Sequence, residues 1–276
     1  MSLTGMFEIA SATDPGRVRS HNEDSIATDP EIGLAVLADG MGGYNAGEVA
    51  SGIAVAMIAR DVRKELKVEQ QMRRGIPASG PLAAPNLLRQ HAAHANRTIY
   101  ETAQNQRQYR GMGTTLVMAL FYDGQVAVGH IGDSRLYRMR DDHLSQLTRD
   151  HSLLQEQIDS GMLTREQARH SRNRGIITRA VGIEPQVETE IHVHDTRPDD
   201  IYLLCSDGLN DMVSDDDIQL TIGALGANLP LVAQQLVQQA NDNGGRDNIS
   251  VILIKVRRNA AVRVGWLNKI IKWARA

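Results

Sequence analysis

Hydrophobic and polar positions repeat with two different periods along the chain. A short continuous apolar run over 33–38 predicts a buried strand, and it ends in Asp39-Gly40. From Val49 to Leu66 apolar residues recur at helical spacing, which predicts an amphipathic helix. A second such stripe, Leu87 to Thr102, follows a stretch over 73–85 whose glycine, proline, alanine and serine content predicts a loop.

After Gly113 the pattern changes to that of strands. Asp123-Gly124 has the composition of a tight hairpin turn between two of them. The predicted strands, with a weaker one at the N-terminus, are 7–10, 114–121, 125–131, 134–139, 187–193, 200–206 and 249–256. A further helix is predicted from about Pro230 to Asn241. Because regular β-α-β alternation is absent, we expect an α+β fold with antiparallel sheets.

Two polar segments depart from these patterns. Ser152 to Arg174 carries two short helical patterns, and Thr164 with Gln167 has the spacing of a capping box, so we expect a mobile excursion. The tail, residues 257–276, places apolar and basic side chains on opposite faces at helical spacing. Such a helix can pack on its own domain, bind a partner protein or make peripheral contact with an anionic membrane, and we favour the first two.

Composition narrows the class of protein. The 276 residues are 42% hydrophobic and 23% charged, enough to build a sizeable core. A net charge of −3 argues against a protein that grips nucleic acid. The single cysteine, Cys205, lies in an apolar run, so we expect it to be a core residue. One cysteine alone cannot form a disulfide within the chain. With no apolar stretch of about 20 residues and no signal-peptide pattern, we expect a cytoplasmic protein.

Acidic residues gather where predicted strands end. They are Glu23-Asp24, Asp39-Gly40, Asp133, Asp207-Gly208 and Asp247-Asn248. One Asp-Gly pair is usually a turn, but carboxylates at several strand ends can converge while the strands hold them rigid. All-oxygen sites suit Mg²⁺ and Mn²⁺, and two such ions roughly 4 Å apart can activate water for attack on phosphorus.

Six strings resemble one known family, the metal-dependent type 2C (PPM) Ser/Thr protein phosphatases in their bacterial form. The resemblance extends from about Met6 to Val256 in the family's order. The strings are Arg17-Val18-Arg19-Ser20-His21-Asn22-Glu23-Asp24, Ala38-Asp39-Gly40-Met41-Gly42-Gly43, Gly111-Met112-Gly113-Thr114-Thr115, Gly129-His130-Ile131-Gly132-Asp133-Ser134-Arg135, Leu204-Cys205-Ser206-Asp207-Gly208-Leu209 and Gly244-Gly245-Arg246-Asp247-Asn248-Ile249-Ser250.

The resemblance implies a four-layer α-β-β-α sandwich, in which two antiparallel sheets are flanked by helix pairs. The catalytic domain would span 1–256, with a flap at about 151–175. Two Mn²⁺ or Mg²⁺ ions would be held by Asp39, Asp207, Asp247 and the carbonyl of Gly40, and a third, weaker one would involve Asp133.

The resemblance also assigns roles beside the metals. Glu23 and Asp24 would act there partly through bound water, and Asn248 would orient Asp247 or a bound water. Arg19 would bind the substrate phosphate, a task suited to a planar guanidinium, with Arg17 as the alternative.

The histidines of the chain have more than one possible role. Met41 stands where eukaryotic members carry the histidine assigned as general acid, so the proton donor is a metal-bound water, His151 or His170, the histidines being expected at the surface. The pair His91 and His94 has helical spacing for a metal, but no carboxylate partner is evident, so we expect packing or surface residues.

The activity implied is hydrolysis of phosphoserine and phosphothreonine in proteins by in-line attack of a metal-bridging hydroxide. A monomer is expected, with phosphorylated proteins and a eukaryotic-like Ser/Thr kinase as partners. The alternatives are a pseudophosphatase that only binds, and another di-metal hydrolase such as a phosphodiesterase or nuclease. The intact carboxylates count against the first, and the specific strings and net charge against the second.

Overall fold

The computed structural model describes residues 3, 5–43, 45–72, 83–164, 167–168, 171 and 175–257. The strands are β1 (Phe7–Asp14), β2 (Asp24–Asp29), β3 (Leu34–Met41), β4 (Gly113–Thr114), β5 (Leu116–Tyr122), β6 (Gln125–Ile131), β7 (Arg135–Arg140), β8 (His143–Gln146), β9 (Glu190–Asp195), β10 (Ile201–Cys205) and β11 (Ile249–Val256). The helices are α1 (Ala46–Met72), α2 (Ala83–Asn105), α3 (Leu153–Asp159), α5 (Asp207–Asn210), α6 (Asp215–Leu225) and α7 (Leu229–Asp242), with a 3₁₀ turn at Arg107–Tyr109.

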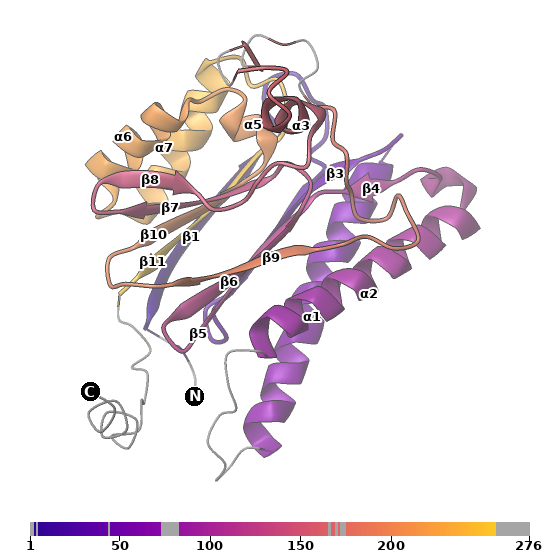
Figure 1. Cartoon of the computed structure of the whole chain (residues 1–276), viewed down its shortest axis with the longest axis horizontal. Coiled ribbons are helices and arrows are strands. Elements are labelled where there is room, and N and C mark those ends of the chain that lie inside the picture. The colour runs from indigo at the N-terminus through magenta and orange to yellow at the C-terminus, as the bar shows by residue number, and fades with distance from the viewer. Residues whose placement is uncertain are drawn as a thin grey trace.

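Two antiparallel sheets stack between two helix pairs, as Figure 1 shows. One sheet has the order β1-β11-β10-β7-β8, and α6 and α7 cover its outer face. The other has the order β2-β3-β5-β6-β9, with β4 beside β3, and α1 and α2 cover it. The predicted α+β class and the α-β-β-α layering are therefore confirmed.

The central strands are buried on both faces, which explains their continuous apolar sequences. In β3, Leu34 and Val36 pack toward α1 and α2, whereas Ala35 and Leu37 pack between the sheets. In β10, Leu203 and Cys205 contact the layer of α6 and α7, whereas Tyr202 and Leu204 face the space between the sheets. Alternation within one apolar run thus fills three separate cores.

The predicted hairpin at Asp123-Gly124 is present. Both residues have positive φ, 42° and 79°, and Tyr122 pairs with Gln125 across the turn. Positive φ at two successive positions is the conformation that Asp-Gly favours in two-residue hairpins. The elements β2, β8, α5, α6 and the 3₁₀ turn were not predicted. Ser214 caps α6 by accepting a hydrogen bond from the Asp217 amide at 3.2 Å.

The polar excursion after His151 starts and ends at neighbouring positions of the fold. Ser152 bridges Ile177, and α3 follows at once. The predicted capping box forms, because the Thr164 amide donates to Gln167 (2.8 Å) and the Gln167 amide donates to Thr164 (3.2 Å).

Three predictions fall on residues that the structure does not describe. They are His170, the tail after Arg257 and positions 73–82 of the predicted loop. The last residues of that predicted loop are helical, because α2 begins at Ala83. Among the helices that the structure describes, none is long and apolar enough to cross a bilayer.

Candidate active site

The strand ends that carry the predicted carboxylates meet at one end of the sandwich. Asp24 at the start of β2 lies opposite Asp39 near the end of β3. On the other sheet, Ser206 directly follows β10, and its hydroxyl donates to the Asp24 carboxylate at 2.8 Å. This hydrogen bond joins the two sheets at the site and places Asp207, the next residue, beside Asp24 and Asp39.

Burial and mutual repulsion make these carboxylates costly to ionise. Burial raises the pKa of Asp39 well above its usual range, and the nearby charges of Asp24 and Asp207 raise it further. Burial, with the charge of Asp133, does the same to the pKa of Asp207. Burial also raises the pKa of Asp24, to about 6. Such a cluster is stable in its ionised form only beside positive charge.

Unpaired oxygens show where that charge fits. Within the described ranges, one oxygen each of Asp24 and Asp207 (Oδ1) is buried without a hydrogen-bond partner. Buried polar atoms are normally paired, so an orphaned carboxylate oxygen indicates a ligand. Because all the donors are oxygens, the residues fit a hard divalent cation such as Mg²⁺ or Mn²⁺.

Backbone contacts fix Asp39 and Gly40. The Thr115 amide donates to the Asp39 carbonyl (2.8 Å), and the Asp39 amide donates to the Thr115 hydroxyl (3.0 Å). A Cβ at Gly40 would overlap the carbonyl oxygen of Gly47 at the start of α1 and lie 2.6 Å from that of Glu23. Glycine at position 40 therefore lets β2, β3 and α1 come together around Asp39.

Asn248 holds the N-terminal loop in place. Its side-chain oxygen accepts from the Glu23 amide at 2.8 Å, and its Nδ2 donates to the carbonyls of Pro15 (3.0 Å) and His21 (2.9 Å). Its own amide donates to the Asp247 carboxylate at 2.9 Å. One residue thus positions both Glu23 and Asp247, where the sequence suggested contact with Asp247 or a water.

Of the two candidate arginines, Arg19 faces the carboxylates. Its guanidinium lies 2.7 Å from Asp247, and its side chain is 52% exposed, so it can reach a ligand from solvent. The Arg17 amide donates to the Gly245 carbonyl at 2.7 Å, and its side chain packs against Gly245. The structure places Arg19, not Arg17, in contact with a predicted metal ligand.

His151 is buried, so the expectation of a surface histidine is wrong. Its ring stacks on His130 with centroids 4.6 Å apart, and its Nδ1 accepts from the Gly132 amide at 3.2 Å. Its Nε2 therefore carries the proton and donates to Glu190 at 3.1 Å. With both ring nitrogens engaged, His151 positions the backbone next to Asp133 and does not offer a proton to a substrate.

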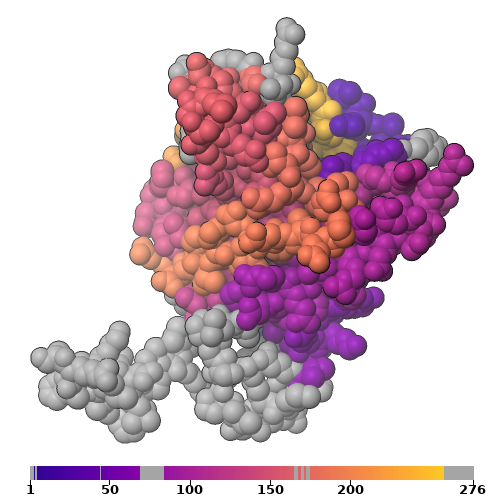
Figure 2. Space-filling model, turned by 45° about the vertical axis from the view of Figure 1, so that its right-hand side comes forward, coloured from indigo at the N-terminus to yellow at the C-terminus, as the bar shows by residue number. Residues whose placement is uncertain are grey.

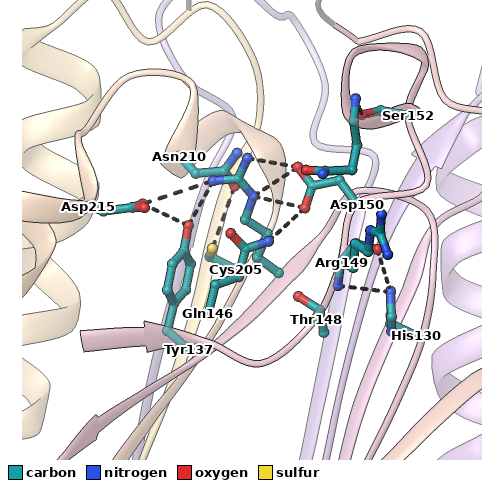
Figure 3. A network of polar contacts seen from close by, with 12 residues as sticks. His130, Tyr137, Gln146, Thr148, Arg149, Asp150, Ser152, Cys205, Asn210 and Asp215 are labelled. Atoms are coloured by element: carbon teal, nitrogen blue, oxygen red, sulfur yellow. Dashed lines mark hydrogen bonds and ion pairs between the residues drawn. The ribbon is translucent and has the colours of Figure 1, made fainter. Parts of the chain in front are cut away.

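The sequence patterns did not predict a charged network that includes Asp150, Tyr137 and Asp215 (Figure 3). Arg135 donates to both carboxylate oxygens of Asp150, at 3.0 and 2.7 Å, and to the Tyr137 hydroxyl at 2.8 Å. Tyr137 in turn donates to Asp215 at 3.0 Å. The signal was an arginine at the start of an apolar strand, which needs a buried carboxylate partner. The pKa of Asp133 rises to about 6 through burial and the charge of Asp150.

The excursion after His151 stands beside this end of the molecule. In Figure 2 it is the red mass at the top, and at its base the His151 amide donates to the carbonyl of Gly132, next to Asp133. Its apolar side chains Met162 and Ile176 are 73% and 47% exposed. The excursion therefore adds an accessible surface next to the acidic site.

A family model for protein phosphatase 2C matches residues 16–252. The chain belongs to the protein phosphatase 2C family. The serine/threonine phosphatase stp of Listeria welshimeri is 35% identical over 249 residues, which cover 88% of this chain and 93% of that protein. The phosphatase PstP of Mycobacterium tuberculosis is 37% identical over 257 residues, which cover 92% of this chain and 46% of PstP.

Solved structures of this phosphatase family have the same fold. Stp1 from Staphylococcus aureus superposes with a TM-score of 0.81 at 32% identity, covering 94% of this chain and 98% of Stp1. The catalytic domain of PstP in complex with two manganese ions has a TM-score of 0.77 at 34% identity, covering 91% of this chain and 99% of that one.

Proposed function

We propose that this chain is a metal-dependent phosphatase that hydrolyses phosphoserine and phosphothreonine in proteins. The observation that carries the proposal is the partly buried carboxylate cluster of Asp24, Asp39 and Asp207. Its members repel one another, and one buried oxygen each of Asp24 and Asp207 is unpaired within the described residues. The names of its relatives, serine/threonine phosphatases, support the same substrate class.

In this proposal Asp39, Asp207, Asp247 and the carbonyl of Gly40 hold two Mn²⁺ or Mg²⁺ ions, as the manganese complex of PstP supports. Asp133 belongs to a third, weaker site. When bound, such ions activate water and neutralise charge on phosphoryl oxygens. Glu23 and Asp24 are the further carboxylates beside the metal ions. The Ser206 hydroxyl holds one Asp24 oxygen in place by its hydrogen bond.

Arg19 binds the phosphoryl group of the substrate. It is held at the site by Asp247 and can exchange that partner for phosphate oxygens, which a guanidinium grips in pairs. The nearby Cys205 thiol does not serve as a covalent nucleophile, because burial raises its pKa to about 12 and keeps it protonated. Since His151 is committed to Gly132 and Glu190, we assign the proton for the leaving oxygen to water.

The remaining parts of the proposal concern the whole protein. Residues 1–256 form the catalytic domain with a flap at about 151–175, and the chain acts as a monomer on phosphorylated proteins. A eukaryotic-like Ser/Thr kinase supplies those substrates. A cytoplasmic location is supported by the single buried cysteine, and a net charge of −3 speaks against nucleic-acid substrates.

The test is phosphate release from a phosphothreonine peptide with EDTA, Mg²⁺ or Mn²⁺. We expect metal-dependent release that falls about 100- to 1,000-fold in Asp207→Asn, by analogy with loss of one charge-stabilising group. Asp199→Asn, an 84% exposed carboxylate, is the matched control and should keep full activity.

Two outcomes would contradict the proposal. Folded wild-type protein that releases no phosphate with any metal would make it a pseudophosphatase. Faster hydrolysis of a phosphodiester than of the phosphothreonine peptide in a parallel assay would make it a phosphodiesterase.

A further inference from the structure

Two histidines of α2 face two carboxylates of α1. His91 and His94 are three residues apart, Asp61 and Glu65 are four apart, and both spacings place side chains on one helix face. One ring nitrogen of each histidine and one carboxylate oxygen of Asp61 lie within 4.8 Å of one another. The expectation that these histidines lack a carboxylate partner is therefore wrong.

Glu65 orients the buried member of the group. His91 is 7% exposed, and its Nε2 lies 3.0 Å from the Glu65 carboxylate. In neutral His91 the proton thus resides on Nε2, which leaves Nδ1 as a lone pair. That Nδ1 is buried and has no hydrogen-bond partner in the part of the chain that the structure describes. A carboxylate at one nitrogen and an unpaired second nitrogen is the arrangement typical of a metal-ligating histidine.

The donor set differs from that of the acidic site. Two imidazole nitrogens and one carboxylate oxygen, with a remaining position open to water, suit Zn²⁺ and its neighbours Co²⁺ and Ni²⁺ better than Mg²⁺. His94 is 54% exposed, so an ion can enter from solvent. Arg60 now pairs with Asp61 at 2.7 Å, but its side chain is 67% exposed and is free to turn away.

The group is well separated from the catalytic residues. Gly47 at the start of α1 contacts Glu23 and Gly40, whereas Asp61 lies fourteen residues further along the helix, about 21 Å away at 1.5 Å per residue. An ion here would touch both outer helices and none of the acidic site.

We propose that Asp61, His91 and His94 form a binding site for a divalent transition metal ion of the zinc type. The ion joins α1 to α2, the helix pair that covers one sheet. It thereby stabilises the folded protein without taking part in phosphate hydrolysis. Glu65 is a positioning residue that holds His91.

Co²⁺ titration in excess Mg²⁺ tests the site directly, since Mg²⁺ fills all-oxygen sites and Co²⁺ bound to imidazole absorbs in the visible region. Wild-type protein should bind one Co²⁺ with such bands, and Zn²⁺ should displace it and raise Tm. His94→Ala should weaken this binding at least about 10-fold and remove the Tm rise, and Glu65→Gln should weaken it about 10- to 100-fold. His94 is at the surface, so its removal leaves the fold intact.

His143→Ala, an exposed histidine of β8, is the matched control and should bind as the wild type does. The proposal is overturned if wild-type protein shows no saturable Co²⁺ bands in excess Mg²⁺. It is equally overturned if His94→Ala keeps wild-type Co²⁺ affinity and the Zn²⁺-dependent Tm rise, which would direct the binding to the other group of suitable spacing, His130, His151 and Glu190. Neither readout depends on phosphatase activity.

Discussion

Single residues at the acidic site act through burial as much as through charge. Asp39 is partly buried, and its hydrogen bonds to Thr115 run through the backbone, so they leave its carboxylate available for a ligand. Arg19 is the opposite case, an exposed cation with one partner. The first can only serve a bound ion, and the second can move between Asp247 and a substrate.

Arg19→Ala should lower kcat/KM for a phosphothreonine peptide about 10- to 100-fold, the loss expected for one charge-assisted pair of hydrogen bonds. Arg17→Ala should change it less than about 3-fold, because the Arg17 amide, which the substitution keeps, makes the bond to Gly245. Steady-state kinetics in saturating Mn²⁺ measure kcat/KM of both variants and so decide which arginine contacts the phosphate. A larger loss in Arg17→Ala would move the phosphate contact to that residue.

The family resemblance predicted which carboxylates would share the site, and the mutual effect of Asp24, Asp39 and Asp207 on their pKa values agrees with that for these three. The resemblance could not predict the states of the histidines. His91, His94 and His151 all looked like solitary polar residues, since their partners Glu65, Asp61 and Glu190 lie 26 to 39 positions away in the chain. Only the packing of α1 on α2, and of the flap base on β9, brings them together.

At the scale of elements, the joint between β3 and α1 determines the site. Gly40 and Gly47 approach so closely that neither position has room for a side chain. The sequence predicted both elements but not this contact, because nothing in a local pattern reports how near two backbones come. The same limit explains the missed β2 and β8, which are polar strands at sheet edges, each held by one neighbour in its sheet.

Gly40→Ala should lower the free energy of unfolding by roughly 1–3 kcal/mol, the usual range for an overpacked contact, and abolish most activity by displacing Asp39. Gly43→Ala, in the loop that follows β3, is the matched control, since a Cβ there meets nothing within 4 Å. Urea denaturation of the two variants compares them. Equal stability of both would show that the β3–α1 joint is looser than described.

For the whole molecule, the acidic site couples stability to pH and to metals. The carboxylates of Asp24 and Asp133 have pKa values raised to about 6 by burial and by negative neighbours. In the unfolded chain the pKa of both groups is about 3.9. Between these values the two carboxyl groups bind more protons in the folded protein than in the unfolded chain, so their contribution to stability falls as pH rises through this window. Bound cations oppose the trend, because they favour the ionised form.

In EDTA, the contribution of these two carboxylates to the free energy of unfolding should therefore be higher at pH 5 than at pH 7. The lowered pKa values of His130, His151 and His194 act in the opposite direction. Mg²⁺ or Mn²⁺ should stabilise the folded protein at pH 7 by binding it. Asp24→Asn should raise stability in EDTA at pH 7 by on the order of 2 kcal/mol, since Asn keeps an oxygen for the Ser206 hydroxyl and carries no charge. It should also remove the Asp24 part of the pH dependence, so that the gain in stability over the wild type is larger at pH 7 than at pH 5, and it should weaken stabilisation by metal. Urea denaturation of both proteins at both pH values, with and without metal, measures all three effects. A gain in Asp24→Asn that is no larger at pH 7 than at pH 5 would show that the carboxylate of Asp24 is not the group that titrates in this window.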